Sequence, residues 1–295
     1  SLEDIAKVQT TPFYVYSQTK ITNTFEQLKN SLDSEIFYAV KANSNQSIIK
    51  LMASLGAGAD VVSVGELERA ILAGVEPQKI IFEGIGKTKQ DIAFAIEKNI
   101  RLINIESIDE LERVNEVALN QNKKINIGIR LNPNIDGQTL DKISTGKKTD
   151  KFGIDTEKLN ELFQALDVSK NVNLIGISCH VGSQMFKINV FAEIFQKMRA
   201  NAQIFLDKGY TIKHVDLGGG LGVNYSQDKE TLNLEQIRNL QFPTPSLPEQ
   251  QKIATILSNV DNLIDSYDKT IQTSKKLKKG LMQKLLTGQI RVKVP

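Results

Sequence analysis

The 295-residue sequence predicts an α/β fold, an incomplete TIM-type (β/α) barrel, followed by a long coiled-coil-like α-helix. Two observations predict the barrel: short β-rich runs alternate with amphipathic segments, and distinctive polar residues lie where these runs end. A third observation predicts the separate helix, because three prolines within residues 243–248 come directly before a heptad pattern.

Seven β-rich runs occur in the first part of the chain, at residues 36–40, 59–62, 79–82, 102–105, 125–131, 174–179 and 214–217. They are separated by amphipathic segments long enough to cross between parallel strands, such as residues 46–55, 65–73 and 108–118. This alternation is typical of two architectures, a barrel and a doubly wound sheet.

Four residues favour the barrel. Lys41 follows the first run, Arg130 lies late in the fifth, His180 follows the sixth and Gly218 follows the seventh. In a (β/α)₈ barrel the carboxyl ends of all strands meet at one rim, where substrates bind. We therefore predict a barrel with its site at that rim.

Composition limits the class of protein. The chain is 40% hydrophobic, has no run of about 18 apolar residues and begins without a signal-peptide pattern, so we expect a cytoplasmic protein without a membrane partner. The single cysteine, Cys179, excludes an internal disulfide and leaves too few thiols for structural zinc; we expect no metal. Residues 243–295 carry nine basic and four acidic residues of a chain whose net charge is +3, which favours a mildly acidic body with a basic tail.

Lys41 lies in Tyr38-Ala-Val-Lys-Ala-Asn43, at the mouth of the first apolar run. A desolvated amine at this position is suited to covalent attachment of an aldehyde cofactor. The alternative is a lysine whose amine simply reaches solvent from a strand end.

Two further motifs follow the last two runs. Gly218-Gly-Gly-Leu-Gly222 offers successive backbone N–H groups without a Cβ, which suits a phosphate; its spacing is not that of a dinucleotide motif, and a plain tight turn is the alternative. His180-Val-Gly-Ser-Gln184 offers an imidazole that can lie against a flat ring and a hydroxyl, on Ser183, that can reach a phosphate. The alternative for His180 is a structural, hydrogen-bonded histidine.

Residues 10–228 contain six further ordered motifs: Asp60-Val-Val-Ser-Val-Gly-Glu66, Phe82-Glu-Gly-Ile-Gly-Lys87, Asn104-Ile-Glu-Ser107, Gly128-Ile-Arg-Leu-Asn-Pro133, Ile143-Ser-Thr-Gly146 and Lys151-Phe-Gly-Ile154. Together with the three above, they resemble those of the fold-type III pyridoxal-phosphate decarboxylases, and most closely the diaminopimelate decarboxylases. The resemblance implies an alanine racemase-like barrel and the decarboxylation of meso-diaminopimelate to L-lysine, a step of lysine biosynthesis.

The resemblance also implies roles for particular residues. Lys41 and His180 would be catalytic, Lys41 holding the cofactor pyridoxal 5'-phosphate covalently and His180 stacking on its ring. Ser183 and the glycine loop would bind the phosphate, and the remaining polar groups would surround the ring. The implied cofactor-binding set comprises Lys41, Asp60, Glu66, Arg130, His180, Ser183, Gly218, Gly219 and Gly220.

After Tyr225 the family continues with an eighth strand, whose glutamate contacts the pyridine nitrogen, and a second, β-rich domain. Residues from about 231 onward do not resemble these parts. We therefore expect a truncated barrel domain at residues 1–228, with about seven of eight strands, open sheet edges and impaired turnover. Residues 11–16 resemble the strand that pairs with the second domain, and we expect them to be exposed.

The remaining chain predicts a proline-rich linker at residues 229–248 and a coiled-coil helix at residues 249–295. The heptad seam comprises Ile253, Ile256, Val260, Leu263, Tyr267, Thr270, Ser274, Leu277 and Leu281. Ser246-Leu-Pro-Glu-Gln-Gln-Lys-Ile-Ala254 and Lys284-Leu-Leu-Thr-Gly-Gln289 resemble the C-terminal part of type I restriction enzyme specificity subunits. We expect a helical partner or a homo-oligomer through residues 249–290, and no sequence-specific nucleic-acid binding.

Three functions remain open at this stage. The first is a diaminopimelate decarboxylase-like enzyme acting on a small amino-acid substrate, fused to a restriction-subunit tail. The second is a non-catalytic interaction protein that joins a type I restriction-modification complex through its helix. The third is another fold-type III enzyme, such as a racemase or an arginine or ornithine decarboxylase.

Overall fold

A computed structural model describes residues 1–137, 152–225, 232–240, 247–287 and 289–291, and the side chains of residues 247–265 and 268 lie outside this description. The chain divides into two compact units, Ser1–Phe242 and Pro243–Pro295. The predicted motifs at residues 143–146 and at residue 151 lie outside the described residues.

The first unit is built on a parallel sheet. Its strands pair in the order β1-β2-β3-β4-β5-β7-β8, and the short strand β6 pairs with β5 beside this path. The strands are β1 (Phe37–Ala39), β2 (Gly58–Val61), β3 (Ile80–Phe82), β4 (Leu102–Ile105), β5 (Ile125–Asn132), β6 (Ile154–Asp155), β7 (Val172–Ser178) and β8 (His214–Asp216).

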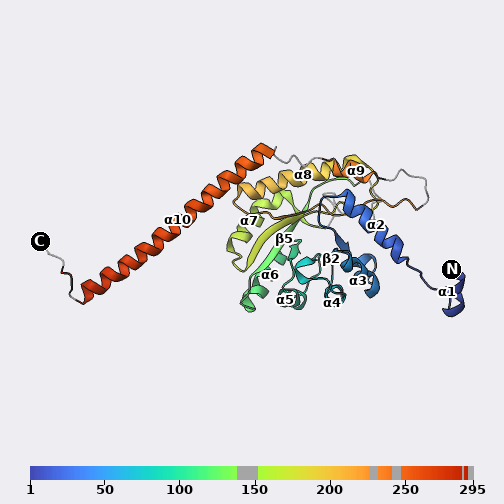
Figure 1. The fold of residues 1–295 in the computed structure, drawn as a ribbon, viewed down its shortest axis with the longest axis horizontal. Coiled ribbons are helices and arrows are strands. Elements are labelled where there is room, and N and C mark those ends of the chain that lie inside the picture. Colours follow the sequence, from blue (N-terminus) through green and yellow to red (C-terminus); the bar gives the residue numbers. More distant parts are fainter. Residues whose placement is uncertain (138–151, 226–231, 241–246, 288, 292–295) are drawn as a thin grey trace. The chain divides into compact units, whose positions relative to one another are not determined.

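Helices cross between successive strands and, from α3 to α8, follow one another around the outside of the curved sheet (Figure 1). They are α1 (Leu2–Val8), α2 (Gln18–Ser31), α3 (Gln46–Ser54), α4 (Val64–Leu72), α5 (Lys89–Lys98), α6 (Ile108–Asn120), α7 (Leu159–Val168), α8 (Ile188–Asp207), α9 (Leu234–Arg238) and α10 (Leu247–Leu286). Three short 3₁₀ turns, η1 (Val40–Ala42), η2 (Pro77–Lys79) and η4 (Thr156–Lys158), complete the described elements.

Burial separates the centre of the sheet from its edges. Every residue of β3 and β4 is buried, as expected for parallel strands covered on both faces. All three residues of the edge strand β1 are only partly buried, and β8 leaves Val215 37% exposed. Within the described residues no strand pairs with both β8 and β1, so the sheet has two open edges, as predicted.

The seven predicted runs are the seven strands of the main path, and the prediction of parallel pairing is confirmed. Strand β6 was not predicted. It does not supply the eighth strand, because it extends β5 through pairs of Leu131 with Ile154 and Asn132 with Asp155 and does not lie between β8 and β1. Its two residues are too few to give a periodic pattern.

Two strand-to-helix connections use the same device. Ser63 caps α4 and Ser107 caps α6, each accepting a hydrogen bond from the N–H of a glutamate three residues later. The glutamate side chains reach back to the strand: Glu66 accepts from the N–H of Val62 at 2.9 Å, and Glu110 accepts from the N–H of Glu106 at 2.7 Å. This variant of the capping box fixes how the chain leaves β2 and β4.

The regions outside the sheet are helical or extended. Residues 11–16 form no strand, and Tyr14 is 90% exposed, in keeping with the expected exposure of this segment. Helix α9, with Ile237 buried, lies inside the range predicted as linker, and α10 is a single helix of 40 residues. Among the described residues no helix is both long and apolar enough to span a membrane.

Candidate active site

The predicted residues meet at the carboxyl end of the sheet. Lys41 lies in the turn after β1, Asp60 in the end of β2, Arg130 in β5 and His180 after β7. The groups share one electrostatic environment: burial raises the pKa of Asp60 to about 6, and the neighbouring charges that act on it are those of Asp216, Lys41, Glu66 and Arg130. The convergence expected of a barrel rim is therefore present in the open sheet.

His180 is held neutral. Burial, and then the positive charges of Arg130 and Lys41, lowers its pKa to about 4. The chain approaches this imidazole closely at Gly218, where a Cβ would lie 2.9 Å from His180 Nδ1 and 2.7 Å from the carbonyl oxygen of Cys179. Gly218 also has a φ of 72°, a region that other residues rarely adopt.

The glycine loop after β8 is tied to the loop after β7. Met185 donates its N–H to the carbonyl of Gly220 at 2.8 Å, and Gly222 donates to the carbonyl of Met185 at 2.9 Å. The N–H of Gly218 is used within the loop, donating to Asp216 Oδ1 at 2.7 Å. At Gly219, by contrast, nothing lies within 4 Å of the position of a Cβ, so the backbone is open to an approaching group there.

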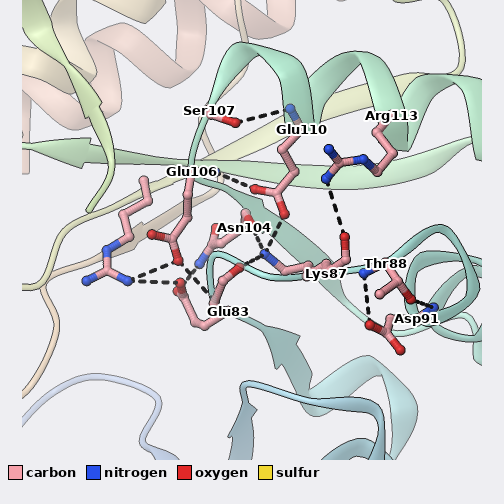
Figure 2. A network of polar contacts seen from close by, with 11 residues as sticks. Glu83, Lys87, Thr88, Asp91, Asn104, Glu106, Ser107, Glu110 and Arg113 are labelled. Atoms are coloured by element: carbon pink, nitrogen blue, oxygen red, sulfur yellow. Dashed lines mark hydrogen bonds and ion pairs between the residues drawn. The ribbon is translucent and has the colours of Figure 1, made fainter. Parts of the chain in front are cut away.

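Arg130 is the buried cation of the site. Its Nη1 lies 3.2 Å from Glu106 Oε1 and 3.9 Å from Glu83 Oε2, and its guanidinium lies 5.0 Å from the centre of the Phe152 ring. Glu83 also accepts a hydrogen bond from the side-chain amide of Asn104 (Figure 2). Two carboxyl groups that were not predicted, those of Glu83 and Glu106, therefore lie beside Arg130 in the predicted polar shell.

Sequence reasoning did not assign roles to Glu83, Asn104, Glu106 and Asp216. Their position in the sequence indicated a role, because each of them lies within the last two residues of a strand or directly after a strand, as the assigned residues do. Glu83, Asn104 and Glu106 stand in motifs already recognised from the family resemblance. The residues at the carboxyl ends of all strands of the main path, and not of four strands alone, are therefore candidates for the site.

The acidic groups are crowded. Burial, and then the charges of Asp60 and Asp216, raises the pKa of Glu83 to about 8, and burial raises the pKa of Asp216. Among the described residues four buried side-chain oxygens at this end of the sheet have no hydrogen-bond partner: Asp60 Oδ1, Glu83 Oε2, Glu106 Oε2 and Ser178 Oγ. Such atoms require an explanation, and a polar ligand with hydrogen-bond donors supplies one.

One predicted residue differs from expectation. Lys41 is exposed, so its amine is not desolvated by apolar packing as we expected at the strand mouth. Ser183 is also exposed and lies midway between β7 and α8. Glu66 is engaged as the capping glutamate of α4, which orients the end of β2 beside Asp60.

The residues present fit pyridoxal phosphate. An accessible lysine amine, a neutral imidazole, a glycine loop open at Gly219 and unpartnered buried oxygens lie at one end of the sheet. A cavity of about 210 Å³ lies away from this site, lined by residues that include Phe37, Gly58 and Lys79, at the opposite, amino end of the strands. Among the described residues no group of His, Cys, Asp and Glu side chains is arranged to hold a metal ion.

Comparison with known proteins agrees with this site. Residues 18–252 match the family described as pyridoxal-dependent decarboxylase, pyridoxal binding domain. The match extends past residue 228, where we predicted the barrel domain to end.

Diaminopimelate decarboxylase of Aquifex aeolicus is 40% identical over 232 residues, which cover 78% of this chain and 55% of that protein. The enzyme of Pseudomonas aeruginosa is 38% identical over 241 residues, 81% of this chain and 58% of that protein. The chain thus spans little more than half the length of these relatives.

Solved structures share the fold of this chain. Diaminopimelate decarboxylase from Helicobacter pylori complexed with L-lysine superposes with a TM-score of 0.78 at 37% identity, covering 81% of this chain and 61% of that one. The enzyme from M. jannaschii in complex with L-lysine gives 0.74 at 38% identity, with 80% and 57% coverage. From the matched residues, the site and these relatives, the chain belongs to the family of pyridoxal-dependent decarboxylases, of which it contains the pyridoxal binding domain.

Proposed function

We propose that the chain binds pyridoxal 5'-phosphate at the carboxyl end of the sheet and acts as a diaminopimelate decarboxylase-like enzyme. The observation that carries the proposal is the convergence of Lys41, Asp60, Arg130 and His180 with the glycine loop from five strands. The relatives' function, decarboxylation of diaminopimelate, supplies the substrate class. When bound, the cofactor supplies the electron sink that takes up the electrons released as CO₂ leaves.

The residues of the chain divide the remaining work. Lys41, exposed beside the site, supplies the amine for covalent attachment and can exchange with the amine of a substrate. His180 offers the face of a neutral ring, since its lowered pKa keeps it uncharged at neutral pH. The open backbone around Gly219 offers N–H groups that a phosphate can approach without meeting a Cβ.

The acidic groups and Arg130 set the charge of the site. Arg130 balances Glu106 and Glu83, while the raised pKa values of Glu83 and Asp60 leave protons available near neutral pH. Such groups can hold or release a proton beside a bound amino acid.

We further propose that turnover by this chain is weak. Among the described residues, the elements that follow β8 are the helices α9 and α10, so no eighth barrel strand supplies the glutamate that the family resemblance led us to expect. The open edges β1 and β8 leave the site less enclosed than a closed barrel would. We also propose a cytosolic location, in keeping with a single thiol, Cys179, that is buried.

The test is a spectroscopic titration followed by an assay. Purified protein titrated with pyridoxal phosphate should develop the absorbance band of the lysine-bound cofactor, and Lys41→Ala should abolish it. Release of CO₂ is then measured with meso-diaminopimelate, arginine and ornithine as separate substrates. No band in the unaltered chain contradicts cofactor binding, and release from arginine or ornithine alone contradicts the substrate assignment.

A second function concerns α10. We propose that it is an interaction helix, because Tyr267, Leu277 and Leu281 on the predicted heptad seam are 62%, 65% and 45% exposed. Its sequence resemblance to the tail of type I restriction specificity subunits supports a helical partner or a second copy of the chain. Light scattering of the full chain and of Leu277→Lys with Leu281→Lys tests self-association, and titration with a purified methylation subunit tests the other partner. A monomer that does not bind this subunit contradicts the proposal.

A further inference from the structure

Lys87 is a lysine buried at the back of the candidate site. Its residue is 3% exposed, and its ammonium donates to the carbonyl oxygens of Gly84 at 2.5 Å and Asn104 at 2.8 Å, and to Glu110 Oε1 at 3.0 Å (Figure 2). An ammonium has three donors, so all three are satisfied. Lys87 therefore joins the loop after β3, the end of β4 and the first turn of α6.

Glu110 extends this connection. Its second oxygen accepts the N–H of Glu106 at 2.7 Å, and its own N–H donates to the capping hydroxyl of Ser107. Glu66 makes the equivalent capping contacts after β2, and Glu110 differs from it in also carrying the ion pair with a buried lysine. The Lys87–Glu110 pair thus connects the segment after β3 to β4 and α6, and the capping of α6 does not require this connection.

The backbone segments that Lys87 holds carry the acidic groups of the site. Glu83 directly precedes Gly84, and the N–H of Gly84 donates to Glu106 Oε1 at 3.0 Å. The same oxygen of Glu106 lies 3.2 Å from Arg130 Nη1, and the side chain of Asn104 donates to Glu83. Displacement of either loop would therefore change the distances among Glu83, Glu106 and Arg130.

Stability alone is a poor explanation of this pair. A buried ion pair is costly to desolvate, and an apolar pair of similar volume often serves stability as well or better. A nearby pair, Lys89 with Glu116 at 2.6 Å, links α5 to α6 with both side chains about half exposed and contacts none of the site residues. What distinguishes Lys87 is its attachment to the backbone at the site.

We propose that Lys87 is a positioning residue, which fixes the loops after β3 and β4 and thereby sets the Glu83, Glu106 and Arg130 arrangement at the candidate cofactor site. The claim about cofactor affinity rests on the proposed function. The claim about loop geometry concerns the protein alone, so the two can be tested separately.

The experiment compares two matched double variants of the full chain. Lys87→Met with Glu110→Gln removes the buried pair without leaving an unpaired charge, and retains a carbonyl oxygen at position 110 for the N–H of Glu106. Lys89→Met with Glu116→Gln makes the same changes in the exposed pair. Amide hydrogen exchange at Gly84, the thermal midpoint and the affinity for pyridoxal phosphate are measured for both, with the amide of Ile129 in β5 as a reference for global opening.

In the Lys87 variant we expect exchange at Gly84 to accelerate by about tenfold relative to Ile129, and cofactor affinity to fall by about tenfold, the factor that corresponds to one lost buried hydrogen bond. The Lys89 variant should match the unaltered chain. Equal acceleration at Gly84 and Ile129, or no change at Gly84, overturns the proposal.

Two further outcomes are decided by the same measurements. If the unaltered chain binds no pyridoxal phosphate, the proposed function fails, and exchange at Gly84 alone decides the role of Lys87. If the double variant does not fold, amide exchange is measured in the single variant Glu110→Gln instead. We expect exchange at Gly84 to accelerate in this variant too, by a smaller factor, while exchange at Ile129 stays unchanged. Equal exchange in that variant and in the unaltered chain overturns the proposal.

Discussion

Glu106 and Arg130 form a buried ion pair across the ends of β4 and β5, with 3.2 Å between Glu106 Oε1 and Arg130 Nη1. Arg130 also lies 3.9 Å from Glu83 Oε2, and its charge opposes the raised pKa values of Asp60 and Asp216. The positive charge of one guanidinium therefore acts on four carboxyl groups at the candidate site: those of Glu83, Glu106, Asp60 and Asp216.

Replacement of Arg130 by Met should destabilise the protein strongly. It would leave Glu106 buried without its cation, and the loss of one partner of a buried pair costs about 3–5 kcal/mol. Urea unfolding measures the change. Lys89→Met, which breaks an exposed pair, is the control and should cost about 0–1 kcal/mol. Equal losses in the two variants would show that Arg130 does not carry this charge balance.

The stability of the protein should fall as the pH rises through the range in which Glu83 titrates. Its pKa in the folded protein is about 8, above its ordinary value of 4.5, so the folded state binds the proton more tightly. This contribution to stability is fully present below pH 4.5 and is lost as the pH rises through 8. Asp60, with a raised pKa of about 6, acts in the same direction over a lower range.

Glu83→Gln isolates this contribution. The amide of glutamine keeps an oxygen that can accept from Asn104 but carries no charge at any pH. As the pH rises from 4.5 to 8, the free energy of unfolding of the variant should therefore increase relative to that of the unaltered chain, by on the order of a few kcal/mol. Unfolding at a series of pH values measures it, with the exposed Glu112→Gln as control. His180, whose lowered pKa gives stability that is lost as the pH falls from 6.5 toward 4, contributes to both proteins and cancels. Parallel pH profiles for Glu83→Gln and the unaltered chain would refute the assignment.

Two neighbouring glycines should respond differently to alanine. At Gly218 the φ of 72° and the contacts of 2.7 Å and 2.9 Å that a Cβ would make predict a loss of about 1–3 kcal/mol in Gly218→Ala. At Gly219 a Cβ meets no neighbour, so Gly219→Ala should keep its stability. It should weaken binding of pyridoxal phosphate, because the added methyl group would obstruct the approach of the phosphate to the backbone of the loop. Thermal unfolding and cofactor titration of the pair separate the two effects. Unchanged cofactor affinity in Gly219→Ala would remove this loop from the phosphate site.

Strand order and the meeting of the site residues could be predicted from the sequence, because apolar runs and strand-end residues are local patterns. The partners within the site could not. Asn104 reaches Glu83 past Gly128, where a Cβ would lie 1.9 Å from Asn104 Oδ1, and this approach depends on the register of β4 against β5. The burial of Lys87 likewise depends on how three segments meet in space. Tertiary geometry, rather than residue type, decides such contacts.

The most direct measurement of the central claim is reductive trapping of the cofactor. The protein is incubated with pyridoxal phosphate, reduced with borohydride and digested, and the modified lysine is identified by mass spectrometry. We predict modification at Lys41 in preference to the exposed lysines of α10, such as Lys275 and Lys278, because the charges of Lys41 and Arg130 both act on His180. Modification spread evenly over exposed lysines, or its absence from Lys41, would contradict a specific cofactor site at the carboxyl end of this sheet.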